Sequence, residues 1–415
     1  MEHYGNAKAR NNLLPFRSPV KRLSLLRELC IRQWSALPSA LRKALIVFIV
    51  MRVTASVAGI IGISTVPSNP IAATEQYSKP RYIKGYEEVF GIWERSDALW
   101  YIHIARDGYG KTGGSAAFFP FYPLLIKAVH TVTGLPWLAA ALLISNAALV
   151  WALYHIYCIA EKEHGSEAAE RAIWYQMLYP GSIFLLAPYP EPLFLCLAAG
   201  ALYAAQKRRW WCAGLCGFII SMTRSTGVLI IIPLLVEFLQ ARKKERSIPV
   251  AESLWLLLTP LGLGAVALYW KIFNGDGLAF LHAQTGWSRS FTAPWITLWE
   301  GMRQGITAPV QYPWGVYIFE LLVIAALIIV AVLSLRIIPL SQSLYIWLMI
   351  LPSWCFPYDG NYFLSNIRFL SILFPAAITI AVIAKRREVD MAFRTVLASL
   401  YGIAAALYVT SQNMF

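Results

Sequence analysis

A short polar segment that follows an apolar run contains the first residues whose types could do chemistry. Residues 93–110 read WERSDALWYIHIARDGYG and combine five charges with four aromatic rings. Helical spacing places Asp97 on the same stripe as Trp100 and Tyr101. A carboxylate among rings at the membrane boundary is costly unless it faces a cavity or a partner. Asp97 is therefore a candidate acid–base group, although a first-turn helix cap explains it equally well.

Two arginines occupy positions where a membrane span is expected. Arg224, in SMTRSTG, joins two apolar segments so short that their turn is expected to lie within the membrane. Arg368, in NIRFLSILFP, stands at the outer end of a later span. Either guanidinium could hold a phosphate through two hydrogen bonds. The simpler alternative is that each side chain extends to the membrane surface.

Further polar groups fall in segments expected on the same side of the membrane. Glu191, in LAPYPEPLF, is expected at an outer turn, either as an exposed helix cap or as a contact in a pocket. The segment 280–295 offers Gln284, Trp287 and Arg289. An aromatic ring with amide and guanidinium groups is suited to stacking on a sugar and hydrogen-bonding it. An interfacial aromatic belt would also explain Trp287.

Composition indicates what must position these residues. Hydrophobic residues make up 58% of the 415 residues, charged residues only 14%, and the mean hydropathy is +0.54. These values are typical of a polytopic membrane protein. The net charge of +14 comes from Lys and Arg clusters between apolar runs. Such clusters indicate cytoplasmic loops and contacts with membrane lipids, not nucleic-acid binding.

Apolar lengths predict an all-α integral membrane protein with about eleven transmembrane helices. Residues 116–134 are too short and too interrupted by prolines to cross, so they are expected to form an interfacial helix. The expected spans are 44–66, 137–160, 171–188, 191–206, a pair of short helices at 210–222 and 226–240, 251–273, 314–334, 342–357, 367–384 and 391–411.

The basic clusters orient this arrangement. Residues 1–43 are expected to form a basic amphipathic segment in the cytoplasm, and residues 44–415 a single transmembrane domain. Loops 67–116 and 274–313 then lie outside. The candidate residues share that side, which predicts an outward-facing, membrane-level cavity. A carboxylate and two guanidiniums there suit a reaction between a lipid-linked anion and a polar acceptor.

Several segments between residues 93 and 375 resemble one family. DALWYIHIARDGY, AAFFPFYPLL, YPGSIFLLAPYPEPLF, TRSTG, FLHAQTGWSR and RFLSILFP occur in the order and spacing of the PIG-V (GPI mannosyltransferase 2) family and its prokaryotic relatives. The resemblance implies a type C glycosyltransferase (GT-C) fold and a polyprenyl-phosphate sugar donor, usually of mannose. It implies a glycolipid or glycan acceptor at the outer or luminal face, hence at the plasma membrane in a prokaryote.

The resemblance also implies residue roles. The family's catalytic Trp-Asp pair maps onto Ser96 and Asp97, so the carboxylate is kept and the aromatic neighbour is not. Asp97 is expected to be the general base of an inverting hexosyl transfer. Arg224 and Arg368 are expected to bind the donor phosphate. The expected substrate contacts are Trp100, Tyr101, Glu191, Gln284, Trp287 and Arg289.

No metal or other cofactor is expected to be required, because two guanidiniums can serve a monoanionic phosphate. Two alternatives to an enzyme stay open. A flippase of lipid-linked sugars would also need buried arginines, although it would be expected to show internal repeats, and none is apparent. A membrane scaffold would tolerate replacement of the polar residues.

Overall fold

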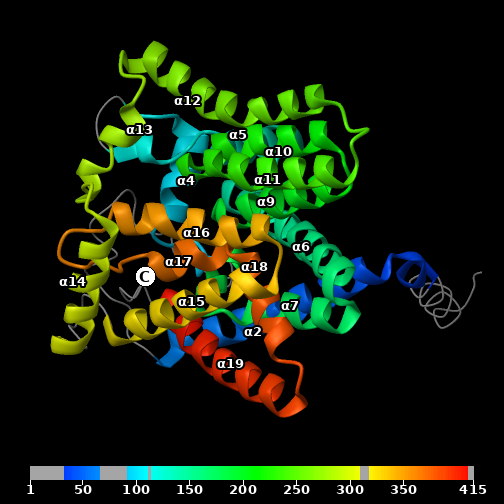
Figure 1. Ribbon diagram of the computed structural model, residues 1–415. Helices are drawn as coiled ribbons and strands as arrows, with labels where there is room; N and C mark the ends of the chain where they lie inside the picture. Colours follow the sequence, from blue (N-terminus) through cyan, green and yellow to red (C-terminus); the bar gives the residue numbers. More distant parts are fainter. Residues whose placement is uncertain (1–31, 66–90, 111–113, 309–316, 410–415) are drawn as a thin grey trace, which may run out of the picture.

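The computed structural model describes residues 32–65, 91–110, 114–308 and 317–409, and this part of the chain is helical (Figure 1). Most of the expected cytoplasmic segment 1–43 and part of both expected outer loops lie outside the described residues. The only bridges found in the described part are two isolated ones, Arg289 with Tyr358 and Tyr358 with Asn361. The all-α prediction is confirmed.

The helices follow one another through short connections. They are α2 (Ser39–Thr65), α4 (Asp97–Asp107), α5 (Phe121–Thr133), α6 (Trp137–His164), α7 (Ser166–Leu178), α8 (Ile183–Leu186), α9 (Glu191–Gln206), α10 (Trp210–Thr223), α11 (Ile231–Lys244), α12 (Leu258–Asn274), α13 (Ala279–His282), α14 (Pro294–Thr307), α15 (Tyr317–Ile337), α16 (Leu340–Cys355), α17 (Asn366–Phe369), α18 (Phe374–Ile383) and α19 (Arg387–Val409). The 3-10 segments that the site uses are η2 (Pro180–Ser182), η3 (Ser225–Ile230), η5 (Thr285–Trp287) and η6 (Leu370–Ile372).

The chain is an integral multi-pass membrane protein. Within the described residues, six helical segments are long and apolar enough to cross a membrane, and eight if each of two bent pairs counts as one span. Large apolar side chains on α2, such as Val53 and Val57, are exposed, as expected for a surface that contacts lipid. The six segments are Ser39–Gly62, Trp137–His164, Ser225–Lys244, Val250–Asn274, Tyr317–Ile337 and Arg387–Val409.

The count differs from eleven because several expected spans are short or bent. The expected straight span 171–188 is corrected: α7 ends at Leu178, and the segment Pro180–Leu186 turns by 97° into α9. Residues Asn366–Ile372 turn by 79° into α18. Helix α10, with 14 residues, is a shorter apolar helix. The two bends place Glu191 at the start of α9 beside Arg368 in α17.

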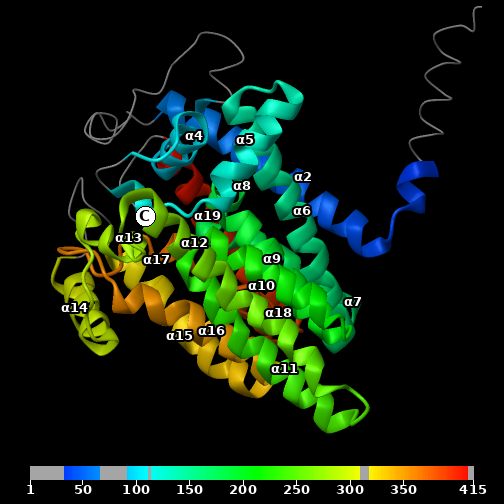
Figure 2. The ribbon, with the colours of Figure 1, turned by 90° about the horizontal axis from the view of Figure 1, so that it is seen from above.

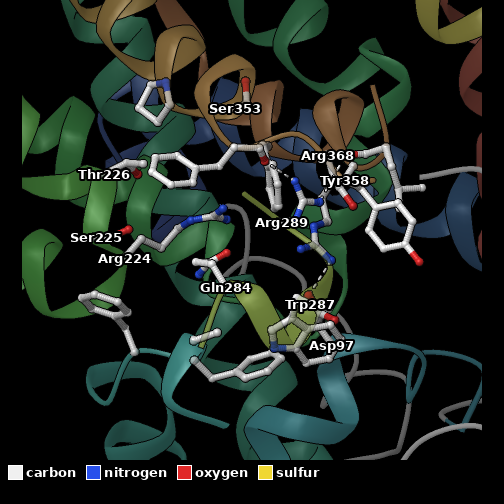
Figure 3. A pocket seen from close by; sticks show the side chains of 18 of the residues that line it. Asp97, Arg224, Ser225, Thr226, Gln284, Trp287, Arg289, Ser353, Tyr358 and Arg368 are labelled. Carbon is white, nitrogen blue, oxygen red and sulfur yellow. Dashed lines mark hydrogen bonds and ion pairs between the residues drawn. The ribbon is translucent and has the colours of Figure 1, made fainter. Parts of the chain in front are cut away.

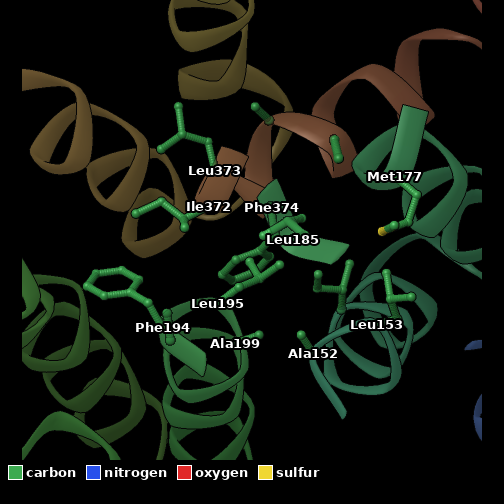
Figure 4. Packing of buried hydrophobic residues seen from close by; sticks show 14 of the residues in the cluster. Ala152, Leu153, Met177, Leu185, Phe194, Leu195, Ala199, Ile372, Leu373 and Phe374 are labelled. Atoms are coloured by element: carbon green, nitrogen blue, oxygen red, sulfur yellow. The ribbon is translucent and has the colours of Figure 1, made fainter. Parts of the chain in front are cut away.

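The core lies where α6 packs against α7 and α9, and where α9 packs against α10. Buried alanines such as Ala152 and Ala199 alternate with larger side chains such as Leu195 and Phe374 (Figure 4). Small residues let membrane helices approach closely. The C-terminal α19 packs against α2, and α14 lies on the opposite side of the molecule from α7 in both views (Figure 1, Figure 2).

Two glycines allow close backbone contacts beside Arg368 and Arg224. A Cβ on Gly181 would collide with the carbonyl oxygen of Ile367, so η2 can touch the backbone beside Arg368 only with glycine there. A Cβ on Gly227 would collide with the carbonyl oxygen of Ile220. The tight turn that Gly227 permits keeps Arg224 at the junction of α10 and η3.

Candidate active site

A cavity of about 720 Å³ lies between the start of α4, the α10–η3 turn, the loop after α13, the end of α16 and α17. Figure 3 shows the side chains of Asp97, Arg224, Gln284, Arg289 and Arg368 reaching into this space. Segments that are distant in sequence therefore supply the charged groups to one chamber, as the sequence predicted.

Asp97 begins α4 and lines the cavity. Its Oδ2 lies 2.7 Å from Nη1 of Arg368, and its side chain is still 24% exposed. Ser96 makes no side-chain capping bond, and its φ of 48° is unfavourable for a residue with a Cβ. The charge of Asp97 thus serves a tertiary partner in the cavity, while its place in the first helical turn also suits the helix dipole.

Glu191 lies between the two predicted phosphate-binding arginines. Its Oε1 is 2.7 Å from Nη1 of Arg224 and 3.4 Å from Nε of Arg368. Its side chain is only 2% exposed, so Glu191 is not an exposed cap, and it does not line the cavity. Its Oε2 is buried with no hydrogen-bond partner among the described residues. Glu191 therefore contacts the cavity through its two arginine neighbours.

The arginines do not extend to a distant surface. The Arg224 side chain is 20% exposed and the Arg368 side chain 11% exposed, and both line the cavity. Together with Asp97 and Glu191 they form a row of alternating charges: Asp97, Arg368, Glu191, Arg224. Pairing of this kind offsets the cost of removing each charge from water.

Arg289 is the third guanidinium in the cavity. The guanidinium carbons of Arg224, Arg289 and Arg368 lie 4.7, 5.4 and 4.8 Å from the centre of the Phe369 ring. Arg289 donates hydrogen bonds to the backbone oxygens of Phe356 (2.8 Å) and Leu364 (3.4 Å). Burial, reinforced by the neighbouring charges of Arg368 and Arg224, lowers the pKa of Arg289 to about 10. Arg289 stays protonated at neutral pH.

Aromatic side chains form the wall on the α4 side. Tyr101, Gln284 and Trp287 line the cavity. Trp287 donates from Nε1 to the oxygen of Gly114 at 3.1 Å. Trp100 is not among the lining side chains, which corrects its expected contact with substrate: it is buried, its ring stacked on Phe118 and edge-on to Trp287. Helix α4 packs against α5, so Trp100 supports the cavity wall from the protein interior.

The loop between α16 and α17 belongs to the site although its residues were not predicted from the sequence. Tyr358, Asp359, Asn361 and Ser365 from this loop line the cavity. The loop pairs with the segment around Arg289, since the backbone N–H of Asp359 donates to the oxygen of Ser288 at 2.8 Å. The polar run YDGN at 358–361, between two apolar segments, is the signal that could have identified it.

The described residues contain no group of three or more His, Cys, Asp or Glu side chains that could hold a metal ion. The charged side chains of described residues that line the cavity are three guanidiniums and two carboxylates: Arg224, Arg289, Arg368, Asp97 and Asp359. The arrangement is suited to binding an anion beside a carboxylate that can accept a proton.

Comparison with known proteins finds a similar family. Residues 46–242, slightly less than half of the chain, match the sequence model described as Mannosyltransferase (PIG-V). Over this segment the chain is similar to the PIG-V mannosyltransferases. The matched segment includes Asp97, Glu191 and Arg224, whereas Arg289 and Arg368 lie beyond it.

Curated mannosyltransferases are similar to part of the chain. The chain is 30% identical over 155 residues to GPI alpha-1,6-mannosyltransferase 2 of Rattus norvegicus, covering 34% of this chain and 31% of the rat protein. It is 28% identical over 171 residues to the Homo sapiens protein of that name, covering 37% of this chain and 34% of the human protein. The chain thus spans about a third of the length of these relatives.

Solved structures give weaker similarities. ArnT from Cupriavidus metallidurans bound to undecaprenyl phosphate aligns over 87% of this chain and 75% of that chain, with a TM-score of 0.47 and 10% identity. An oligosaccharyltransferase of Archaeoglobus fulgidus aligns over 88% of this chain and 53% of that chain, with a TM-score of 0.41 and 14% identity. At TM-scores below 0.5, neither alignment identifies the fold or the ligand of this chain.

Proposed function

We propose that this chain is a member of the PIG-V family and a membrane glycosyltransferase with a GT-C fold. It transfers a hexose, mannose in our proposal, from a polyprenyl-phosphate donor to a hydroxyl group of a glycolipid or glycan acceptor. The observation that carries the proposal is the contact of Asp97 with Arg368, within a cavity that also contains Arg224 and Arg289. A proton acceptor beside a cluster of guanidiniums is what displacement of a phosphate by a hydroxyl requires.

The proposed step follows from these positions. The acceptor oxygen attacks the anomeric carbon from the side opposite the phosphate, so the configuration inverts. Its proton passes to the carboxylate of Asp97, and the bond between the anomeric carbon and the phosphate oxygen breaks. Arg224 and Arg368 stabilise the charge that develops on that oxygen. Glu191 fixes the two guanidiniums from the protein side.

We place the N-terminal segment in the cytoplasm and the cavity at the outer face. The cluster Arg242, Lys243 and Lys244 ends α11, while Arg224 stands at the start of the same span, beside the cavity. Basic residues favour the cytoplasmic side of a membrane. The acceptor and the lipid-linked donor would then meet outside the cytoplasm.

Asp97→Asn tests the proposed base. The amide keeps the size of the side chain but cannot accept the proton, so transfer from a radiolabelled polyprenyl-phosphate mannose should fall about a hundred- to ten-thousandfold. The measurement is the initial rate of purified protein in nanodiscs, for folded protein that elutes as wild type does. Asp107→Asn, at the exposed far end of the same helix, is the matched control and should retain the wild-type rate.

Normal transfer by Asp97→Asn would refute the assignment of the base. The same protein in liposomes distinguishes the transporter: movement of intact donor lipid across the bilayer without sugar transfer would replace the enzyme with a flippase. If replacing the cavity residues changes neither sugar transfer nor lipid movement, the protein is better explained as a scaffold.

A further inference from the structure

The charges in the cavity are unequally compensated. Arg224 is paired with Glu191, and Arg368 is paired with Asp97 and Glu191. Among the residues that the structure describes, Arg289 takes part in no ion pair of this kind: its two hydrogen bonds go to neutral backbone oxygens. Asp359 lines the same cavity without forming an ion pair with Arg289. The positive charges of Arg224 and Arg368 are matched by the negative charges of Glu191 and Asp97. The positive charge of Arg289 has no such partner among the described residues.

The backbone around Arg289 holds its guanidinium in place. The antiparallel bridge with Tyr358 and the hydrogen bond from Asp359 to Ser288 join its loop to the loop before α17. The two carbonyls that Arg289 contacts belong to that second loop. A guanidinium has five N–H groups, and these two bonds leave donors that can point into the cavity. The group is thus fixed without being neutralised.

A bound anion would reduce the repulsion between Arg289 and the other guanidiniums. The guanidinium carbons of Arg289, Arg224 and Arg368 all lie within 5.4 Å of the centre of the Phe369 ring. The depressed pKa of Arg289 has its first cause in burial and its second in the charge of Arg368, and the opposing charge of Asp97 offsets only part of this shift. A bound anion would oppose both causes, because it adds negative charge beside the guanidinium.

We propose that Arg289 is the principal contact of the donor phosphate, and that Arg224 and Arg368, already neutralised by carboxylates, mainly shape the site around it. This inference rests on the proposed function and assigns a residue that was expected to contact only the sugar. A phosphodiester has a single negative charge, which matches the single uncompensated guanidinium. The anion would then sit between Arg289 and the Arg368–Asp97 pair, beside the proposed base.

Direct binding tests this assignment without turnover. The probe is the methyl diester of a short-chain polyprenyl phosphate, which has one negative charge as the proposed donor does, measured by titration of purified protein in nanodiscs, with the corresponding polyprenyl alcohol as the uncharged reference. Arg289→Gln should weaken binding of the phosphate about tenfold or more, since it removes a hydrogen bond between charged groups. Binding of the alcohol should be unchanged. Arg224→Gln should weaken phosphate binding less.

Two further variants separate charge from folding. Arg289→Lys keeps the positive charge but not the planar contact with two carbonyls, and it should recover most of the phosphate affinity. Arg303→Gln, an exposed arginine on α14 paired with Glu300, is the matched control and should bind as wild type does. If Arg289→Lys does not recover affinity, the loss in Arg289→Gln comes from a disturbed loop structure and not from the missing charge. That result would overturn the assignment.

The outcomes distinguish this inference from the proposed enzyme. Wild-type phosphate affinity in Arg289→Gln, or a larger loss in Arg224→Gln, overturns the assignment even if sugar transfer is observed. If phosphate binding depends on Arg289 but the protein transfers no sugar, the anion site is supported and the proposed glycosyltransferase activity is refuted.

Discussion

At the scale of single residues, the site depends on how buried charges are shared. Glu191 is nearly inaccessible and contacts two guanidiniums, so it acts as a positioning residue and not as a group that touches substrate. Its Oε1 accepts a hydrogen bond from Arg224 at 2.7 Å and lies 3.4 Å from Nε of Arg368, while its Oε2 has no hydrogen-bond partner among the described residues. Its stabilising effect therefore combines one charged hydrogen bond with attraction to a second guanidinium.

Glu191→Gln should destabilise the protein by about 2–3 kcal/mol, because Arg224 loses a charged hydrogen-bond partner and Arg368 loses a negative charge 3.4 Å from its Nε. The measurement is the midpoint of thermal unfolding in detergent, together with the transfer rate. Glu300→Gln, which removes an exposed ion pair with Arg303, should change stability by less than about 1 kcal/mol. Equal effects of the two substitutions would mean that the buried row of charges contributes little.

At the scale of elements, broken helices carry the site. Arg224 follows the end of α10, Asp97 begins α4, and Arg368 lies in a four-residue helix bent by 79° from α18. A straight span would place these side chains at different depths. Irregular backbone inside a membrane protein is tolerated where it lines a cavity. Helix ends also leave backbone groups that a site can use.

Gly181→Ala should misplace Arg368, because the added methyl group meets the carbonyl of Ile367 and must push η2 and α17 apart. A displacement of about 1 Å at a catalytic site can cost about a hundredfold in rate. We therefore expect a large loss of sugar transfer, measured as initial rate, with a smaller change in thermal midpoint. Gly264→Ala in α12, where a methyl group meets nothing within 4 Å, is the control and should be neutral or stabilising. An unchanged rate in Gly181→Ala would show that α17 adapts.

At the scale of the whole molecule, the distribution of basic residues and the position of the cavity together define a direction across the membrane. The cavity lies at one end of the span Ser225–Lys244, and a basic cluster lies at the other. Gln304 on α14 donates a hydrogen bond to the backbone oxygen of Gly360, which lines the cavity, so residues on α14 report on the side near the cavity.

Single cysteines introduced on a cysteine-free background test this orientation. A membrane-impermeant maleimide should label Arg303→Cys on α14 in intact cells, and should label Lys243→Cys on α11 only after the membrane is opened. Both native side chains are exposed, so access to each depends on the membrane alone. Labelling of Lys243→Cys in intact cells would reverse the proposed topology and move the site to the cytoplasm.

The sequence by itself determined the class of protein and identified the charged residues at the site apart from Asp359. Apolar length located α2, α6 and α15 as spans, because the hydrocarbon thickness fixes how long a crossing helix must be. Helical spacing placed Asp97 on one stripe, and the cost of charge in a membrane singled out Arg224 and Arg368. These inferences need only local properties of the chain.

Only the tertiary structure decided which charges pair and which remain uncompensated. Periodicity gives the face of a helix but not its partner, so it could not bury Glu191 between two arginines, remove Trp100 from the lining or add the loop at 358–365. Nor could it bend Pro180–Leu186 toward α9. These features depend on contacts between distant segments, and such contacts form only when the helices pack together.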